Sequence, residues 1–347
     1  MELDERKLKI LAAIVEAYIN TGEPVGSKTV CSMLDFPVSS ATVRNEMAAL
    51  SELGILEQPH TSSGRVPSYQ GYRIYIDRLM DIKPLTETEK NEIDALFNVK
   101  DPDPDKLLQD ACEALAQFTS CATVTTTLTP HDAVINRIEI MKAGRTTAVV
   151  LVMASNGVVK SKVCRVGFQL SYDVLDFFVK FVNDRFKNRT LENITLAFIE
   201  TLLVSLGEYS VVFSPLLVSI YEICREIEEG NFILGGQTNL LAYRELNDHA
   251  HELFTFLNNR KMLTSLIDSS LNDMVKVILG KEAEQYELED LGVVVAKYKI
   301  GRMDGGAIGV IGPVRIDYSR LIPHLRYFAD TLGRLLADTI ESQNDQP

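Results

Sequence analysis

The segment from Ser39 to Leu50 constrains the fold of this chain more than any other stretch. If it forms a helix, Val43, Met47 and Leu50 lie on one face, because they are four and three residues apart. The opposite face is small and polar and carries one arginine. Such a face suits the major groove of DNA, while the apolar face needs a small core to pack against. The outward residues are Ala41, Thr42, Arg44, Asn45 and Ala48.

Signals for helix ends place two further helices before this segment. Asp4 can cap a first helix, which Gly22 and Pro24 end. Ser27 is expected to cap a short second helix, Lys28–Leu34. Two short helices joined by a tight link predict a helix-turn-helix by spacing alone.

A hairpin is expected after the third helix, which Ser39 or Ser40 caps and Gly54 ends. Ile55–Gln58 is strand-like, a polar segment follows, and Val66–Ser68 returns. We interpret this stretch as a wing whose hydroxyl, imidazole and guanidinium groups can contact the DNA backbone. The wing candidates are His60, Thr61, Ser62, Ser63 and Arg65.

The arrangement predicts a DNA-binding surface on residues 1–83. Thr42, Arg44 and Asn45 are the candidates for contact with base edges. A serine at a helix start is usually just a cap, and a serine-rich loop is usually just solvated, so neither feature alone indicates DNA. The occurrence of both features in this order, together with a small three-helix core, does indicate DNA binding. The phosphate candidates on the helices are Ser27, Lys28, Ser39 and Ser40.

The charge distribution is compatible with a DNA-binding module on an acidic body. The net charge is −13, of which residues 1–80 contribute −2 and residues 81–347 contribute −11. An acidic body limits non-specific binding to phosphate, so affinity depends on a small basic footprint. No run approaches the roughly 18 apolar residues of a membrane span. The start lacks a signal-peptide pattern. We therefore expect a cytoplasmic protein without a membrane partner.

The sequence offers little support for a metal site or an enzyme. The five cysteines are scattered and never spaced as C-x-x-C, which favours a reducing compartment over a zinc ribbon. His249 and His251 have no neighbouring pattern that completes a metal site. Val275 stands where a P-loop ending at Gly280-Lys281 would need glycine, and no G-x-S-x-G occurs. We expect no cofactor. Two alternatives to a plain DNA-binding regulator are considered. One is an enzyme with a DNA-binding appendage, and the other is a regulator that senses a metabolite in its α/β domain.

Behind Pro84 the patterns alternate between helix and strand. Strand-like segments come before and after a long helical stretch, which indicates a split α/β domain with a second domain inserted. The apolar run Tyr209–Tyr221 suits either a core or a subunit contact, and both readings stay open. We expect a turn at Asp304–Gly306 and a last helix from Asp317 or Ser319. The expected strands are 122–129, 134–141, 146–154, 158–166, 293–300 and 307–311.

Three motifs resemble the heat-inducible transcription repressors, the HrcA family: Tyr18–Thr29, Ser40–Met47 and Pro59–Pro67. A later stretch, Gly309–Tyr318, is similar to a fourth motif of that family, although Val314 and Ile316 replace its usual Thr and Met. The resemblance covers nearly the whole chain and is closest before residue 84.

The resemblance implies an α+β multidomain fold. A winged helix-turn-helix would occupy residues 1–83, and a GAF-like α/β domain would occupy 84–168 and 259–347. A mainly helical dimerisation domain would be inserted at 169–258. It also implies a homodimeric repressor of chaperone operons that binds the inverted-repeat operator CIRCE. The GroE chaperonin would keep this repressor competent.

Overall fold

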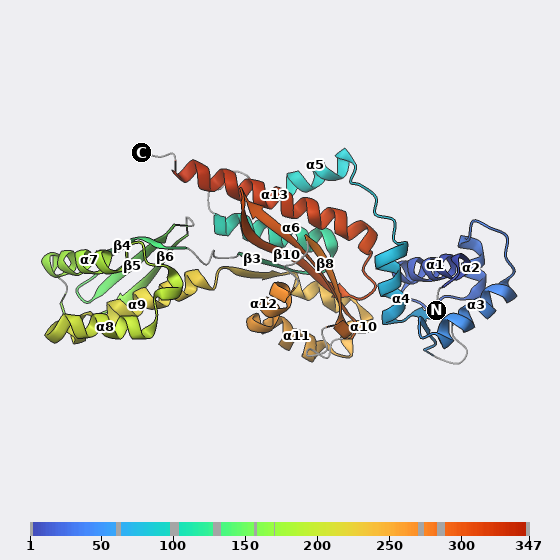
Figure 1. Cartoon of the computed structure of the whole chain (residues 1–347), viewed down its shortest axis with the longest axis horizontal. Coiled ribbons are helices and arrows are strands. Elements are labelled where there is room, and N and C mark those ends of the chain that lie inside the picture. The colour runs from blue at the N-terminus through green and yellow to red at the C-terminus, as the bar shows by residue number, and fades with distance from the viewer. Residues whose placement is uncertain are drawn as a thin grey trace. The chain divides into compact units, whose positions relative to one another are not determined.

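The computed structural model describes residues 3–59, 64–97, 104–127, 133–155, 158–169, 171–269, 274–282 and 289–344 (Figure 1). The chain forms two compact units, and we describe each by itself. Unit 1 comprises Met1–Thr125, Ile233–Tyr298 and Ala307–Leu335. Unit 2 comprises Thr126–Phe232, Lys299–Gly306 and Leu336–Pro347.

The first module of unit 1 has the predicted order of helices and strands. Its strands β1 and β2 pair antiparallel, with Leu56 opposite Pro67. A π-helical turn, η1, extends the last helix. The elements are α1 (Glu5–Thr21), α2 (Ser27–Met33), α3 (Ser40–Glu52), β1 (Leu56–Glu57), β2 (Val66–Pro67), α4 (Tyr69–Ile74) and η1 (Tyr75–Leu79).

Local capping explains where these helices begin and end, with one correction to the predictions. The Asp4 side chain accepts a hydrogen bond from the Lys7 amide, and Gly22 ends α1 at φ +68°. The prediction that Ser27 caps α2 is wrong. Gly26 occupies the cap position in an extended conformation, and Ser27 is already the first helical residue. Ser39 caps α3, as one of the two predicted alternatives.

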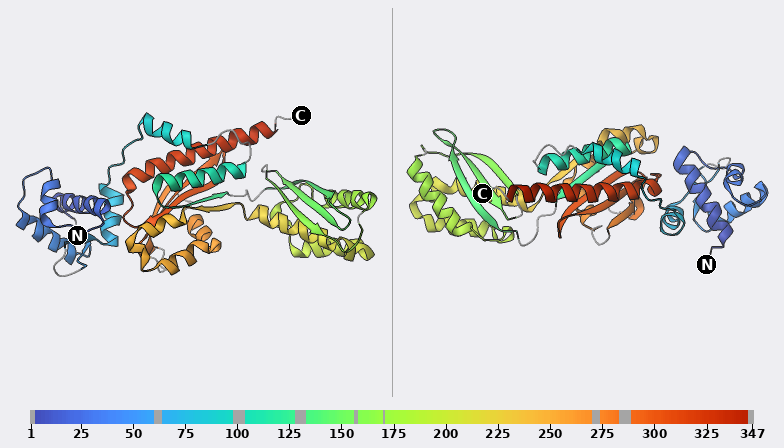
Figure 2. Two further views of the ribbon diagram at one scale, coloured as in Figure 1. Left: turned by 180° about the vertical axis from the view of Figure 1, so that it is seen from behind. Right: turned by 90° about the horizontal axis from the view of Figure 1, so that it is seen from above.

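The remainder of unit 1 is a sheet with helices on both sides. Among the described residues, five strands form this sheet in the order β7-β3-β10-β9-β8. Helices α6 and α13 cover one face, and α10 to α12 gather on the other side (Figures 1 and 2). The helices are α5 (Glu87–Leu96), α6 (Pro104–Thr119), α10 (Arg244–Asn247), α11 (Ala250–Asn258), α12 (Arg260–Ser269) and α13 (Tyr318–Asn344), with short turns η4 (Gln237–Ala242) and η5 (Gly280–Glu282). The strands are β3 (Ala122–Thr127), β7 (Phe232–Gly235), β8 (Val275–Leu279), β9 (Leu291–Ile300) and β10 (Met303–Pro313).

Aromatic packing joins the helices above the sheet. Phe328 of α13 lies 5.6 Å from Phe97 and 6.0 Å from Phe118, between ring centroids. Thr86 and Glu89 form the capping box that starts α5. The turn predicted at Asp304–Gly306 is wrong, because these residues belong to β10. The chain turns instead at Gly301, which adopts φ +61°, a conformation that glycine reaches without steric cost.

Unit 2 contains an antiparallel sheet, in the order β4-β5-β6, packed against helices. Alternate residues of β5 are buried, and helices α7 and α9 contact the strands. The Phe178 and Phe213 rings stack with centroids 4.3 Å apart. The elements are β4 (Ile135–Lys142), β5 (Thr147–Ala154), β6 (Val159–Arg165), α7 (Tyr172–Phe186), η2 (Leu191–Asn193), α8 (Leu196–Leu206), η3 (Gly207–Tyr209) and α9 (Ser210–Glu228).

The compact units divide the chain differently from the predicted domain ranges. The prediction gave strands 134–166 to the GAF-like domain and began the insertion at residue 169. Strands β4 to β6 instead share a core with α7 and α9, so unit 2 starts at Thr126 and its main segment ends at Phe232. Asn156-Gly157, a dipeptide that favours a hairpin turn between the strands expected at 146–154 and 158–166, lies outside the described residues. The predicted domain assignments stay predictions.

One segment of unit 2 is long and apolar enough to cross a membrane, contrary to the expectation from the sequence. Leu196–Glu228 reaches a mean hydropathy of 1.6 over its most apolar window among the described residues. The segment bends at Gly207, which adopts φ +56° and separates α8 from α9. Phe213, Leu216 and Leu217 are fully or almost fully buried in the unit 2 core, and core helices pass the same test of length and composition.

Gly71 provides a test of the packing in the first module. A Cβ added there would lie 2.3 Å from the Ile55 carbonyl oxygen, a backbone atom that cannot move independently. We expect Gly71→Ala to destabilise this module by about 1–3 kcal/mol, although alanine normally favours a helix. Calorimetric unfolding of the full chain measures the effect. Gly26→Ala is the matched control, since nothing lies within 4 Å of its added Cβ; equal stability of the two variants would contradict the close approach.

Candidate nucleic-acid interface

Helix α3 buries one face and presents the other to solvent. Val43 and Leu50 have no exposed surface, and Met47 retains 4%. Arg44 and Asn45 are exposed on the outer face. Neither side chain makes a hydrogen bond or ion pair to another residue that the structure describes. The sequence therefore predicted correctly which side of this helix is available to a partner.

The start of α3 is fixed by hydroxyl groups. The Ser39 Oγ accepts a hydrogen bond from the Thr42 amide at 3.0 Å, and the two side-chain hydroxyls lie 2.8 Å apart. Ser39 is exposed and Thr42 is half-buried. Of the predicted base-edge candidates, Thr42 thus has its hydroxyl engaged, whereas the longer Arg44 and Asn45 side chains are free to reach outward.

A second pair of serines joins the two helices of the turn. The Ser27 and Ser40 hydroxyl oxygens lie 2.8 Å apart, and both residues are half-buried. This bond connects the first turn of α2 to the first turn of α3. Lys28, the next residue of α2, is exposed, and its cationic side chain has no ion-pair partner among the residues that the structure describes. Ser27 and Ser40 therefore fix the helix starts beside which Lys28 is presented.

The acidic residue of α3 is directed toward α1 and paired there. Glu46 is half-buried and lies 3.0 Å from the Lys7 ammonium and 3.8 Å from the Arg6 guanidinium. Hydrogen bonds to Asp4 and Glu46 raise the pKa of Lys7. Two cations of α1 thus offset the charge of Glu46.

Arg65 holds the base of the wing. Its backbone pairs with Val25 through two hydrogen bonds of 2.8 and 2.9 Å, and its Nε donates to the Ser51 Oγ at 2.9 Å. Arg65 is half-buried. This predicted phosphate contact therefore also has a structural role. The wing candidates His60, Thr61, Ser62 and Ser63 lie outside the described residues.

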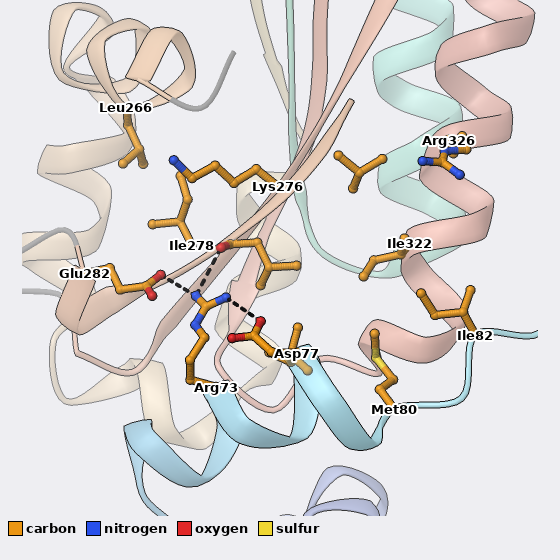
Figure 3. Close-up of a pocket in the computed structure, with 13 residues that line it drawn as sticks. Arg73, Asp77, Met80, Ile82, Leu266, Lys276, Ile278, Glu282, Ile322 and Arg326 are labelled. Carbon is orange, nitrogen blue, oxygen red and sulfur yellow. Dashed lines mark hydrogen bonds and ion pairs between the residues drawn. The ribbon is translucent and has the colours of Figure 1, made fainter. Parts of the chain in front are cut away.

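The sequence did not reveal a polar contact between this module and the sheet of unit 1. Glu282 accepts a hydrogen bond from the Arg73 guanidinium (Figure 3). It also accepts one from the Tyr69 hydroxyl at 2.7 Å. The same guanidinium donates to the Val277 carbonyl oxygen at 3.2 Å. We call Tyr69, Arg73 and Glu282 the polar clamp. No motif could have indicated it, since Arg73 and Glu282 are 209 residues apart.

A second contact involves Arg315, which belongs to the late motif of the sequence. Its guanidinium forms an ion pair with Glu245 and lies 5.6 Å from the centre of the Tyr243 ring. A Cβ added to Gly22, at the end of α1, would come within 3.3 Å of this guanidinium. Arg315 thus places a cation beside the end of α1.

Metal ligation finds no support in the geometry. No three His, Cys, Asp or Glu side chains gather to hold a metal ion in the part of the chain that the structure describes. His249 and His251 lie at the start of α11 without such neighbours. The expectation that no cofactor is bound stays a prediction.

A family model and individual relatives of known name agree on the family that this chain resembles. The family model described as "HrcA protein C terminal domain" matches residues 105–322. A protein of Clostridium botulinum (strain Alaska E43 / Type E3), named "Heat-inducible transcription repressor HrcA", is 35% identical over 97% of this chain and 98% of its own length. A protein of Lachnoclostridium phytofermentans with the same name is 36% identical, with both chains covered completely.

A solved structure supports the same overall fold. It is described as a hypothetical protein at 2.2 Å resolution and matches with a TM-score of 0.68 over 97% of this chain and 100% of that one. The two sequences are 23% identical. This likeness concerns the fold alone.

The Ser39 cap can be tested by stability. Ser39→Ala removes the acceptor of the Thr42 amide, and we expect a loss of about 0.5–2 kcal/mol in unfolding free energy. Ser39→Asn should retain most of the stability, because asparagine caps helices about as well as serine. Urea unfolding followed by circular dichroism gives both values. Equal losses in the two variants would show that the cap is not what Ser39 contributes.

Proposed function

Because the chain belongs to the HrcA family of heat-inducible transcription repressors, we propose that α1 to α4 and the β1–β2 hairpin form a winged helix-turn-helix that binds DNA. The family makes the chain a transcription repressor and not an enzyme. One observation supports α3 as the recognition helix above all others. Its apolar face is completely packed, while Arg44 and Asn45 are exposed and free of partners among the described residues.

The proposed contacts follow from side-chain chemistry. Arg44 suits a bidentate contact with guanine, and Asn45 suits adenine. Thr42 would contact a base edge through its methyl group or its shared hydroxyl. Lys28 would pair with phosphate, and the α3 start would direct amide groups toward the DNA backbone. The other backbone candidates remain Ser27, Ser39, Ser40, Arg65 and the wing residues His60, Thr61, Ser62 and Ser63.

We also propose that two copies bind together. Unit 2 exposes large apolar side chains on its α8–α9 side, where Val204 is 81% and Val211 is 83% exposed. Leu196, the first residue of α8, and Tyr209 of η3 are 60% and 63% exposed. Isolated exposed apolar residues are ordinary, but a group of this size on neighbouring helices is typical of an interface. A second copy of this chain is the proposed occupant, in a twofold arrangement.

A twofold dimer has a direct consequence for the operator. Two recognition helices related by a twofold axis require an inverted repeat, with half-sites about 34 Å or a multiple apart. The family resemblance makes CIRCE the proposed operator, upstream of chaperone operons in the cytoplasm.

Regulation by the GroE chaperonin completes the proposal. Chaperonin would keep the repressor folded, and heat-unfolded proteins would occupy chaperonin and lower the amount of competent repressor. This scheme requires a body of marginal stability, in which a small loss of free energy reduces the active fraction.

A footprint of the purified protein on the DNA upstream of its own gene tests the proposed function. We expect protection of one inverted repeat at nanomolar protein, with strong dependence on salt. Uniform, sequence-independent protection would overturn the assignment of a specific operator.

Base reading by Arg44 is separable from phosphate contact by Lys28. We expect Arg44→Ala to cost about 1–3 kcal/mol of operator affinity and to relax specificity at one base pair. Lys28→Ala should weaken all sequences about equally and reduce the salt slope by about 1 per contact. Fluorescence anisotropy with operator and scrambled duplexes measures both effects. Arg78→Ala, at an exposed arginine of η1, is the control. Unchanged specificity in the Arg44 variant would remove it from base reading.

The proposed dimer interface can be tested with two variants, each of which replaces an exposed valine of unit 2 by glutamate. We expect Val211→Glu to convert the dimer into monomer at micromolar concentration, because it buries an unpaired charge. Val163→Glu, at a 68% exposed position of β6, is the matched control. Sedimentation equilibrium measures the association state. Loss of the dimer in the Val163 variant alone would move the interface to the open face of the sheet.

A further inference from the structure

Unit 1 contains a pocket of about 680 Å³ between the first module and the sheet (Figure 3). Pockets of this size commonly hold a small organic molecule. Helix α4 and η1 form one wall, β8 and α12 form another, and α13 forms a third. The pocket residues are Arg73, Ile76, Asp77, Met80, Ile82, Leu266, Val275, Lys276, Val277, Ile278, Glu282, Ile322 and Arg326.

The charges in this pocket favour an anion. Both carboxylates, Asp77 and Glu282, are already paired with Arg73. Two further cations, Lys276 and Arg326, line the pocket from β8 and α13. Arg326 is exposed and forms no ion pair with any residue that the structure describes. The formal charges of the lining residues sum to +1, because Arg73, Lys276 and Arg326 stand against Asp77 and Glu282. Arg326 has donors available for a carboxylate.

An apolar strip lies next to Arg326. Met80, Ile82 and Ile322 project from the segment after η1 and from α13 toward the same space (Figure 3). Ile82 is 50% exposed, a large apolar surface that the fold itself leaves uncovered. A hydrocarbon chain placed there would remove this surface from water. The combination of a free guanidinium and an adjacent apolar strip fits one ligand class.

We propose that this pocket binds an amphipathic organic monoanion, with its carboxylate on Arg326 and its hydrocarbon part on Met80, Ile82 and Ile322. The site is distinct from the DNA-binding face of α3. It needs no rearrangement of the polar clamp, because the pairs of Arg73 with Asp77 and Glu282 stay in place.

The position of the pocket gives such a ligand a regulatory consequence, which rests on the proposed function. Its residues come from both the DNA-binding module and the sheet with its helices, so a bound molecule favours the arrangement in which both walls are present. A molecule that binds one arrangement better than another shifts the equilibrium toward it. DNA binding and ligand binding are then coupled, and the coupling is reciprocal.

Calorimetric titration of the full chain with octanoate tests the site without DNA. Octanoate supplies the carboxylate and a short chain. Octanamide supplies the same chain without charge, and inorganic phosphate supplies charge without a chain. We expect saturable binding of octanoate, at least tenfold tighter than binding of either control. No saturable binding, or equal binding of octanoate and octanamide, would overturn the proposal.

Two arginine variants locate the ligand. Arg326→Gln should weaken octanoate binding about tenfold. Arg334→Gln should leave it unchanged, since Arg334 is an exposed arginine on the same helix outside the pocket. An equal effect of the two variants would overturn the assignment of the carboxylate to Arg326. Circular dichroism of both variants checks that the fold is retained.

The coupling has its own measurement. Operator affinity is determined with and without saturating octanoate, and we expect a change of at least threefold in either direction. Octanoate binding with an unchanged operator affinity would overturn the regulatory consequence. Failure of the proposed function appears in the footprint, whereas failure of the site appears in the calorimetry, so the two are distinguishable.

Discussion

The packing of α3 against the first module is the constraint on which the DNA-binding surface depends. Val43 and Leu50 are completely buried, together with Ile10, Leu11 and Ile14 of α1. Burial of side chains this large contributes about 1.5–3 kcal/mol each to folding. The rotation of α3 about its axis is therefore determined by apolar packing. Arg44 and Asn45 face outward as a consequence, and their side chains can serve recognition because they take no part in the core.

Ion pairs add to the effect of apolar packing on the outer face of α3, because they decide where the Glu46 side chain lies. Glu46 would oppose DNA if it faced outward, but it lies against Lys7 and Arg6. Ion pairs near the protein surface contribute little to stability, about 0–1 kcal/mol. These pairs matter more for DNA binding than for stability, because an unpaired carboxylate near the phosphate backbone would weaken association. The net charge of −2 over residues 1–80 therefore does not describe the outer face of α3, where Arg44 is exposed and Glu46 is directed toward α1.

Local signals in the sequence predicted the helices and strands well. Contacts between residues far apart in the chain could not be predicted from it. The spacing of Val43, Met47 and Leu50 was sufficient to orient α3, since helix periodicity is a local property. Ser27 was misassigned as a cap because its hydroxyl bonds to Ser40, thirteen residues away. The turn near residue 304 was misplaced because glycine occurs at both candidate positions, and only the backbone conformation of Gly301 distinguishes them.

The same argument explains why the extent of unit 2 and the polar clamp were not foreseen. Strands β4 to β6 read as part of the preceding α/β pattern, and only their shared core with α7 and α9 shows which unit they belong to. The clamp is a partly exposed ion pair with a tyrosine, and such pairs are worth about 1 kcal/mol. A ligand present at 100 times its dissociation constant stabilises its bound state by about 2.7 kcal/mol. A ligand that binds only when both walls of the adjacent pocket are present adds this energy to that of the clamp's ion pair, and it therefore favours the arrangement that the clamp already holds.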